Sequence, residues 1–216
     1  MFQNFDISIF LLAVLPVLLA ITVHEAAHGY AARYYGDRTA EQLGRLTLNP
    51  LAHIDPVGTL LVPLLTFMFT PFMFGWAKPV PVQTRNLRNV RIGMRVVAIA
   101  GPLSNLAMAF LWGLAMVAAA FVPASFQYPL QQMGYYGVMI NAVLFVLNMM
   151  PILPLDGGRF IDTFLPPRLS QQFQKTEAYG TWVILLLLMT GILGAIMSPF
   201  VRSIMSAVAS VVSALS

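Results

Sequence analysis

Cysteine is absent from this chain, and charged residues are scarce. None of the 216 residues is cysteine, and only 9% are Asp, Glu, Lys or Arg. The lack of cysteine excludes disulfides and thiolate metal ligands, although it leaves the redox compartment undecided. Soluble domains carry about 25% charged residues. This composition therefore leaves no room for a sizeable soluble domain beside the apolar segments.

Apolar residues dominate what is present. They make up 58% of the chain, and the mean hydropathy is +0.77. We therefore expect an all-α integral membrane protein with a single polytopic domain over residues 1–216. The formal charge of +4 fits basic cytoplasmic loops better than a nucleic-acid partner.

Five apolar runs approach the length of about 20 residues that a membrane-spanning helix needs. They cover residues 7–32, 57–75, 93–122, 135–152 and 178–198. The first lacks a basic leader and a cleavage signal, so we expect a retained span. The Ser-containing tail 199–216 is too polar to assign. We expect five to six transmembrane or re-entrant helices, with a catalytic core over residues 7–160 and accessory helices in 178–216.

The second run is the weakest candidate for a straight helix. Pro63 and Pro71 interrupt it, and the polar sequence GWAKPVPV follows. The alternating prolines favour an extended edge near the active site, with the N–H groups of Val80 and Val82 free to pair with a second peptide. A stiff loop is an equally good interpretation of this segment.

The sequence HEAAH ends the first apolar run. His24 and His28 lie one helical turn apart, so both imidazoles can face a single metal ion. Glu25 lies about 100° around the helix, within reach of water at that metal. Two core histidines and a buried glutamate are the alternative, but that arrangement is costly in lipid. Two histidines leave a tetrahedral site incomplete, so a third protein ligand is expected.

Two further polar residues stand in proline-rich breaks. Asp156, in NMMPILPLDGGRF, follows an apolar run, and it fits either a protein-enclosed cavity or a helix cap at the water boundary. His53, in NPLAHIDP, fits a loop-tethering role better than metal ligation.

HEAAH and the downstream NMMPILPLDGG together resemble the paired signature of the site-2 protease family. GPLSN, GRLTLNPLAHIDPVGT and GWAKPVPV resemble its short prokaryotic form, without PDZ or nucleotide-sensing domains. The resemblance implies an intramembrane zinc metalloprotease that cleaves membrane-spanning substrates. It also implies one Zn²⁺ ion per chain on His24, His28 and Asp156, with Glu25 as catalytic base. Asn148 would steady the oxyanion or the substrate, and Asn105 would lie near the substrate path.

Three rival functions remain. A membrane zinc protease of another family takes its third ligand from a later glutamate, but Glu177 has no helical His or Glu partner. A metal transporter needs metal-binding groups spread across the membrane, whereas this chain has one compact set. An inactive scaffold that binds substrate helices has usually lost a ligand or the base, and all four groups are present here.

The metal hypothesis also constrains topology. If Asp156 meets the two histidines, an even number of crossings separates them. One of the three apolar runs between them must then turn back, or its polar sequel must return through the protein interior, and the proline-broken 57–75 run is the natural choice. This arrangement places the active site toward the cytoplasm of a prokaryotic inner membrane and the N-terminus outside. Only Arg202 lies outside the group on the cytoplasmic side, which comprises Arg33, Arg38, Arg45, Lys78, Arg85, Arg88, Arg91, Arg95, Arg159, Arg168 and Lys175.

Overall fold

Helices account for nearly all regular structure in the computed structural model, which describes residues 7–61 and 78–215. No β-strand occurs within those two ranges, so the all-α expectation is confirmed. In chain order the α-helices are α1 (Ile7–Tyr34), α2 (Thr39–Gln42), α4 (Val90–Ala118), α5 (Ala124–Asn148), α6 (Asp156–Asp162), α7 (Pro167–Lys175), α8 (Glu177–Met189) and α9 (Ile192–Leu215). Shorter turns of helix are η1 (Pro50–His53), η2 (Pro56–Leu61), η3 (Thr84–Asn86) and η4 (Ala119–Phe121).

Four of the described helical segments are long and apolar enough to cross a bilayer. They are Leu11–Tyr34, Val90–Phe121, Ala124–Asn148 and Ile192–Leu215. Large apolar side chains such as Leu11, Leu111 and Phe200 remain exposed on them, as expected for surfaces in contact with lipid tails.

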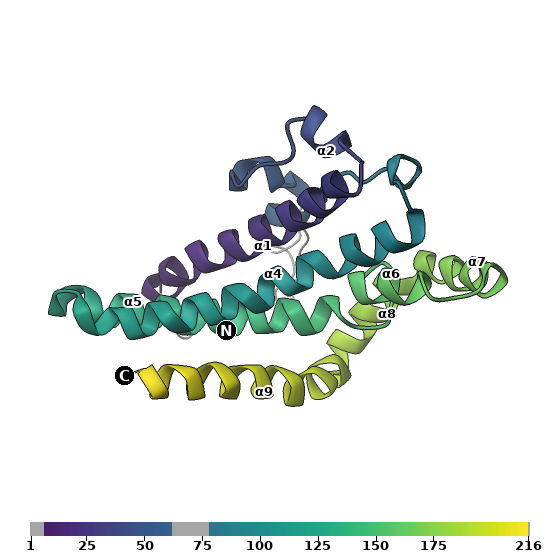
Figure 1. Cartoon of the computed structure of the whole chain (residues 1–216). Coiled ribbons are helices and arrows are strands. Elements are labelled where there is room, and N and C mark those ends of the chain that lie inside the picture. Colours follow the sequence, from purple (N-terminus) through teal and green to yellow (C-terminus); the bar gives the residue numbers. More distant parts are fainter. Residues whose placement is uncertain (1–6, 62–77, 216) are drawn as a thin grey trace.

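Helices α1, α4 and α5 form the centre of the bundle, where α4 contacts both α1 and α5 (Figure 1). Small residues allow the close approach. A Cβ atom at Gly137 on α5 would lie 2.2 Å from the Trp112 ring on α4, and one at Gly134 would lie 2.3 Å from Met116. Small residues at helix contacts are typical of membrane bundles.

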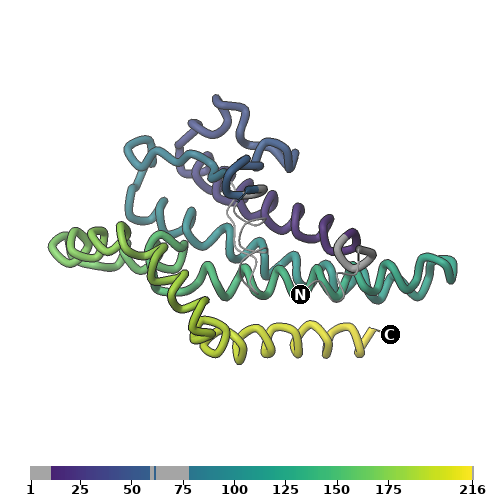
Figure 2. The backbone as a smooth tube through the Cα atoms, turned by 180° about the vertical axis from the view of Figure 1, so that it is seen from behind, coloured from purple at the N-terminus to yellow at the C-terminus, as the bar shows by residue number. Residues whose placement is uncertain are grey.

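The connection between α1 and α4 leaves and re-enters the bundle at the same end. The Arg88 N–H, just before α4, donates to Tyr35 O, just after α1, over 2.9 Å. The start of α4 therefore lies beside the end of α1. Helix α4 runs away from that end, and α5 returns toward it (Figure 2).

The expected extended edge at KPVPV is not confirmed as a strand, because residues 78–83 have no regular secondary structure. Backbone N–H groups of this segment donate to loop and side-chain acceptors, and within the described part of the chain they form no ladder with another strand. Lys78 N–H donates to His53 O at 2.9 Å, and Gln83 N–H donates to the Asp37 carboxylate at 2.6 Å. Most of the 57–75 run, including Pro63 and Pro71, lies outside the described residues.

The C-terminal part differs from the sequence expectation. The apolar run 178–198 is divided between α8, which ends at Met189, and α9, which begins at Ile192. Gly191 between them has φ +75°, a left-handed conformation that ends helices. The tail that appeared too polar to assign is the larger part of α9. This helix packs on α4 and α5, with Val208 buried against Ala109 and Val138.

Candidate metal centre

The two histidines of HEAAH occupy the same face of α1. His24 and His28 are buried, and their Nε2 atoms lie 3.0 Å apart. The two rings are nearly perpendicular, at 87°, with centroids 4.6 Å apart. The one-turn spacing therefore brings both ring nitrogens to one point, as the sequence indicated.

Asp156 meets this pair from a distant part of the chain. Its Oδ2 lies 3.2 Å from His24 Nε2 and 3.3 Å from His28 Nε2. Asp156 is the first residue of α6, and the glycines after it allow that turn to press against the preceding loop. A Cβ atom at Gly157 would lie 2.4 Å from the Met149 carbonyl, and one at Gly158 would lie 2.6 Å from the Ile152 carbonyl carbon.

Hydrogen bonds on the other ring nitrogens fix the proton positions. His28 Nδ1 lies 2.7 Å from Val97 O, and His24 Nδ1 lies 2.7 Å from Asn105 Oδ1. A main-chain carbonyl only accepts, so Nδ1 of His28 carries a hydrogen, and in the neutral ring that a metal requires its Nε2 is bare. The same holds for His24 when Asn105 presents its oxygen. In metal sites generally, a ligating histidine donates its other ring N–H to an acceptor of this kind, which orients the ring.

With both rings neutral, two bare nitrogens and a carboxylate oxygen converge with no hydrogen between them. Asp156 Oδ2 is buried and has no hydrogen-bond partner within the described chain. Three electron-rich atoms at this separation repel one another unless a cation lies among them. Tetrahedral zinc with bonds of about 2.0–2.1 Å holds its ligand atoms roughly 3.3 Å apart. The observed separations of 3.0–3.3 Å match that value, so these residues fit zinc.

Glycine at position 101 makes room for the two rings. Gly101 lies on α4, and a Cβ atom there would lie 2.4 Å from His28 Nε2 and 2.7 Å from His24 Cε1. Both distances are shorter than any normal carbon contact. The first residue of GPLSN therefore serves the metal centre by having no side chain.

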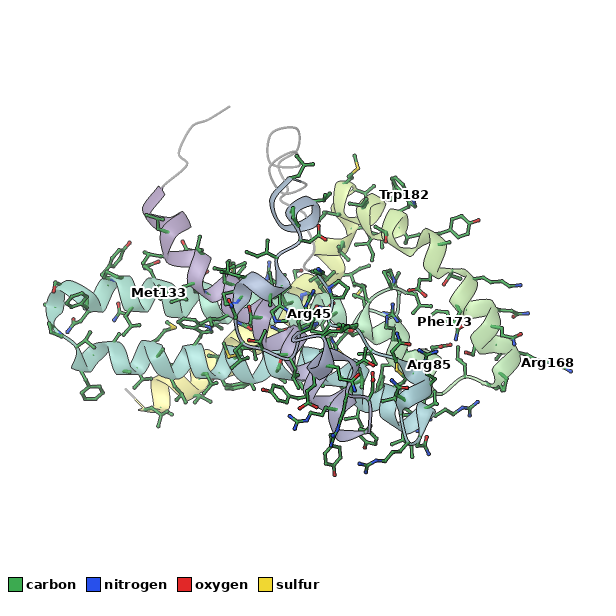
Figure 3. All side chains as sticks on the ribbon, turned by 90° about the horizontal axis from the view of Figure 1, so that it is seen from above. Arg45, Arg85, Met133, Arg168, Phe173 and Trp182 are labelled. Atoms are coloured by element: carbon green, nitrogen blue, oxygen red, sulfur yellow. The ribbon has the colours of Figure 1, made fainter. Side chains whose placement is uncertain are left out.

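Glu25 is half-buried, and residues 78–83 cover it. The buried Val80 donates its N–H to Glu25 Oε2 at 2.8 Å. Arg45 fixes this segment from the other side, with its Nη2 donating to Lys78 O at 3.0 Å. Figure 3 shows Arg45 over the middle of the molecule, above α1. The Val80 donor is thus already engaged, whereas the Val82 N–H has no hydrogen-bond partner among the described residues.

The two predicted asparagines occupy different surroundings. Asn148 Nδ2 donates to Leu144 O of its own helix at 3.0 Å, and no described hydrogen bond joins it to His24, His28 or Asp156. Asn105, expected near the substrate path, contacts His24, with its Oδ1 2.7 Å from His24 Nδ1. Its neighbour Asn141, on α5, has no exposed surface and was not singled out from the sequence. The sequence did offer a signal for Asn141, because a single amide side chain within an apolar run is costly in a membrane and is often functional.

The remaining candidates lie elsewhere. His53 is buried at the end of η1, with Nε2 3.0 Å from Thr47 O, which is the kind of contact expected of a tethering residue. Glu177 forms a surface ion pair with Arg159 at 2.9 Å. Within residues 7–61 and 78–215, the group that can share a metal ion is His24, His28 and Asp156.

Comparison with known proteins identifies the family of this chain. The model of peptidase family M50 matches residues 114–191. The protein YwhC of Bacillus subtilis, which carries the provisional name of a zinc metalloprotease, is 35% identical over 94% of this chain and 91% of its own length. The chain belongs to peptidase family M50. The site-2 protease resemblance is thereby confirmed.

More distant M50 relatives carry the same provisional name. Rip2 of Mycolicibacterium smegmatis is 29% identical over 85% of this chain and 69% of its own length. MJ0611 of Methanocaldococcus jannaschii is 26% identical over 74% of each chain. No solved structure gives a significant match. Family and fold together make this chain a membrane-associated protease of the zinc metalloprotease type.

Proposed function

We propose that this M50 member is an intramembrane zinc endopeptidase that hydrolyses peptide bonds within or near membrane-spanning segments. The observation that carries the proposal is the convergence of His24 Nε2, His28 Nε2 and Asp156 Oδ2 within 3.0–3.3 Å on the helices of an apolar bundle. Zinc bound there polarises a peptide carbonyl and lowers the pKa of water toward about 7.

Glu25 is the proposed general base. Its position beside His24 on α1 places it about 100° around the helix from the ligand His24. The carboxylate takes a proton from the attacking water and delivers it to the leaving amine nitrogen. The Val80 N–H donates to Oε2, which orients the carboxylate.

Substrate binding is proposed along residues 78–83 and at the end of α5. A substrate helix must unwind before attack, and the free Val82 N–H can replace one of its lost backbone hydrogen bonds. The Asn148 amide, now bonded to Leu144 O, can rotate to donate to the oxyanion. The partners implied are a membrane-spanning protein or peptide and the lipid bilayer.

The proposed location is a prokaryotic inner membrane, with the active site toward the cytoplasm and the N-terminus outside. The Arg88–Tyr35 hydrogen bond supports it, because residues 35–88 then begin and end on one side of the bundle. Figure 3 shows Arg85 and Arg168 at one end of the molecule and Met133 toward the other. Basic residues mark the cytoplasmic side of membrane proteins.

Three purified proteins, the wild type and two variants, test the proposal. Wild type should hold about one zinc per chain and cleave a model membrane-spanning peptide. Glu25→Gln should keep the zinc and lose at least about 100-fold in cleavage, because it removes the base alone. Asp156→Ala should lose zinc, because it removes a ligand.

Glu41→Gln is the matched control for the base. Glu41 pairs with Arg33 at the surface of α2, 3.2 Å away, so its amide should leave zinc and cleavage unchanged. Full zinc in Asp156→Ala would contradict the ligand set. A wild type that holds zinc and cleaves no membrane-spanning peptide would point to an inactive scaffold.

A further inference from the structure

Two fully buried amides form a chain between the bundle centre and the metal site. Asn105 on α4 and Asn141 on α5 have no exposed surface, although both helices are apolar enough to span a membrane. A buried amide costs several kcal/mol if it lacks partners. Both have them. Asn105 Nδ2 lies 3.0 Å from Asn141 Oδ1, and Asn141 Nδ2 lies 2.8 Å from Gly137 O.

Main-chain carbonyls fix the direction of this chain of hydrogen bonds. Gly137 O can only accept, so Asn141 must present its nitrogen there and its oxygen to Asn105. Ala20 O also can only accept, and it lies 3.1 Å from Asn105 Nδ2. The two hydrogens of Asn105 Nδ2 are thus both used, one by Ala20 on α1 and one by Asn141 on α5.

The orientation of the Asn105 amide determines the tautomer of His24. With its nitrogen committed, Asn105 must present Oδ1 to His24 Nδ1, 2.7 Å away. That oxygen accepts, so the hydrogen lies on Nδ1 and the bare Nε2 faces Asp156. His28 obtains the same tautomer directly from a main-chain acceptor, Val97 O. His24 has a side-chain amide instead, and an amide could rotate by half a turn unless it is held.

We propose that Asn141 is a positioning residue for the metal centre, which acts through Asn105 to hold His24 in its metal-binding tautomer. This inference rests on the proposed function, since it assumes that the site binds zinc. We call the hydrogen bonds from Asn141 through Asn105 to His24 the relay. Because Asn105 also bonds to Ala20, these hydrogen bonds connect α1, α4 and α5 beside the candidate metal centre.

The test compares zinc affinity among single and double variants of the full chain. Asn141→Ser can keep a bond to Gly137 O, since a serine hydroxyl commonly bonds the carbonyl one turn earlier, but it has no oxygen that reaches Asn105. Zinc dissociation constants come from chelator competition, and Co²⁺ visible spectra report the ligand geometry. Loss of an outer partner weakens metal binding by about 10–100-fold, so we expect roughly tenfold for Asn141→Ser and more for Asn105→Leu.

Two patterns in the zinc affinities of the variants would identify the relay. The double variant Asn105→Leu/Asn141→Ser should bind zinc no more weakly than Asn105→Leu alone, because Asn141 acts through Asn105. Asn105→Asp should recover most of the affinity that Asn105→Leu loses, because its carboxylate still accepts from His24 Nδ1. A purely structural role would lower thermal stability without either pattern.

The controls separate the possible failures. Ser104→Ala removes a hydrogen bond within α4, to Gly101 O, and should leave zinc affinity unchanged. Unchanged affinity in Asn141→Ser, or additive losses in the double variant, would overturn the relay. If Asn141→Ser does not fold, Asn141→Leu replaces it in the same cycle. A folded wild type that binds no zinc would contradict the proposed function itself.

Discussion

At the scale of single residues, the candidate metal centre depends on two features. The Nε2 atoms of both histidines carry no hydrogen, and the neighbouring residue on α4 is a glycine without a Cβ atom. His24 and His28 have bare Nε2 atoms because their Nδ1 hydrogens are committed to Asn105 and Val97. Gly101 has no Cβ, and the two rings occupy the space where one would lie. A close approach of this kind is a common reason for glycine within a helix, where it otherwise costs stability.

The first prediction concerns Gly101→Ala. The added methyl would lie 2.4 Å from His28 Nε2, so the rings must move out of position. Zinc affinity should fall by at least about tenfold, since metal sites depend on ligand placement. Chelator competition measures the change.

Gly194→Ala on α9 is the matched control, because a Cβ atom there meets nothing within 4 Å. Its zinc affinity should equal that of wild type. Equal affinity in Gly101→Ala would show that the rings and α4 lie farther apart than the structure has them.

At the scale of elements, Asp37 joins the end of α1 to the segment that precedes α4. Helix α1 ends at Tyr34, and Gly36 with φ +110° turns the chain. The Asp37 carboxylate then accepts from Thr39 N–H at 3.0 Å, Gln83 N–H at 2.6 Å and Asn86 Nδ2 at 3.0 Å. The joint brings residues 83–86 beside the end of α1, and Gln83 is only three positions after Val80, which donates to Glu25.

The hydrogen bonds to the Asp37 carboxylate should make the free energy of unfolding depend on pH. Burial raises the pKa of Asp37, but the hydrogen bonds from Thr39, Asn86 and Gln83 outweigh it and lower the pKa below its ordinary value. A lowered folded-state pKa contributes stability above the unfolded value of about 3.9, and this is lost as the pH falls through the folded-state pKa.

We therefore expect Asp37→Asn to lower the free energy of unfolding at pH 7 by about 1–3 kcal/mol. The difference from wild type should shrink below about pH 4. Thermal unfolding in detergent from pH 7 to pH 3 measures it. Asp162→Asn removes the charge of a carboxylate that accepts one exposed hydrogen bond, from Gln174, and should change stability less. A pH-independent difference would contradict the assignment to the carboxylate charge.

At the scale of the whole molecule, the bundle separates a basic end from an uncharged one. The end of α1 and the start of α4 meet where basic residues gather, whereas the turn between α4 and α5, residues 119–123, carries no charge. The two ends therefore differ enough to set the orientation in a membrane.

Orientation can be measured cleanly because the chain has no cysteine. Ser125→Cys, exposed at the start of α5, should react with a membrane-impermeant maleimide in intact cells. Gln171→Cys, exposed on α7, should react only after the membrane is permeabilised. The reverse pattern would place the metal centre toward the outer face.

Sequence alone determined the membrane class, the helical pairing of His24 with His28 and the break that carries Asp156, because local spacing and composition suffice for these. It did not determine the division of the last apolar run at Gly191, because apolar content is continuous across that glycine. Nor did it indicate that residues 78–83 bond to Glu25 and Asp37 instead of forming a strand. The roles of Gly101, Asn105 and Asn141 required the packing of α1, α4 and α5, because contacts between residues 36 to 85 positions apart leave no local pattern in the sequence.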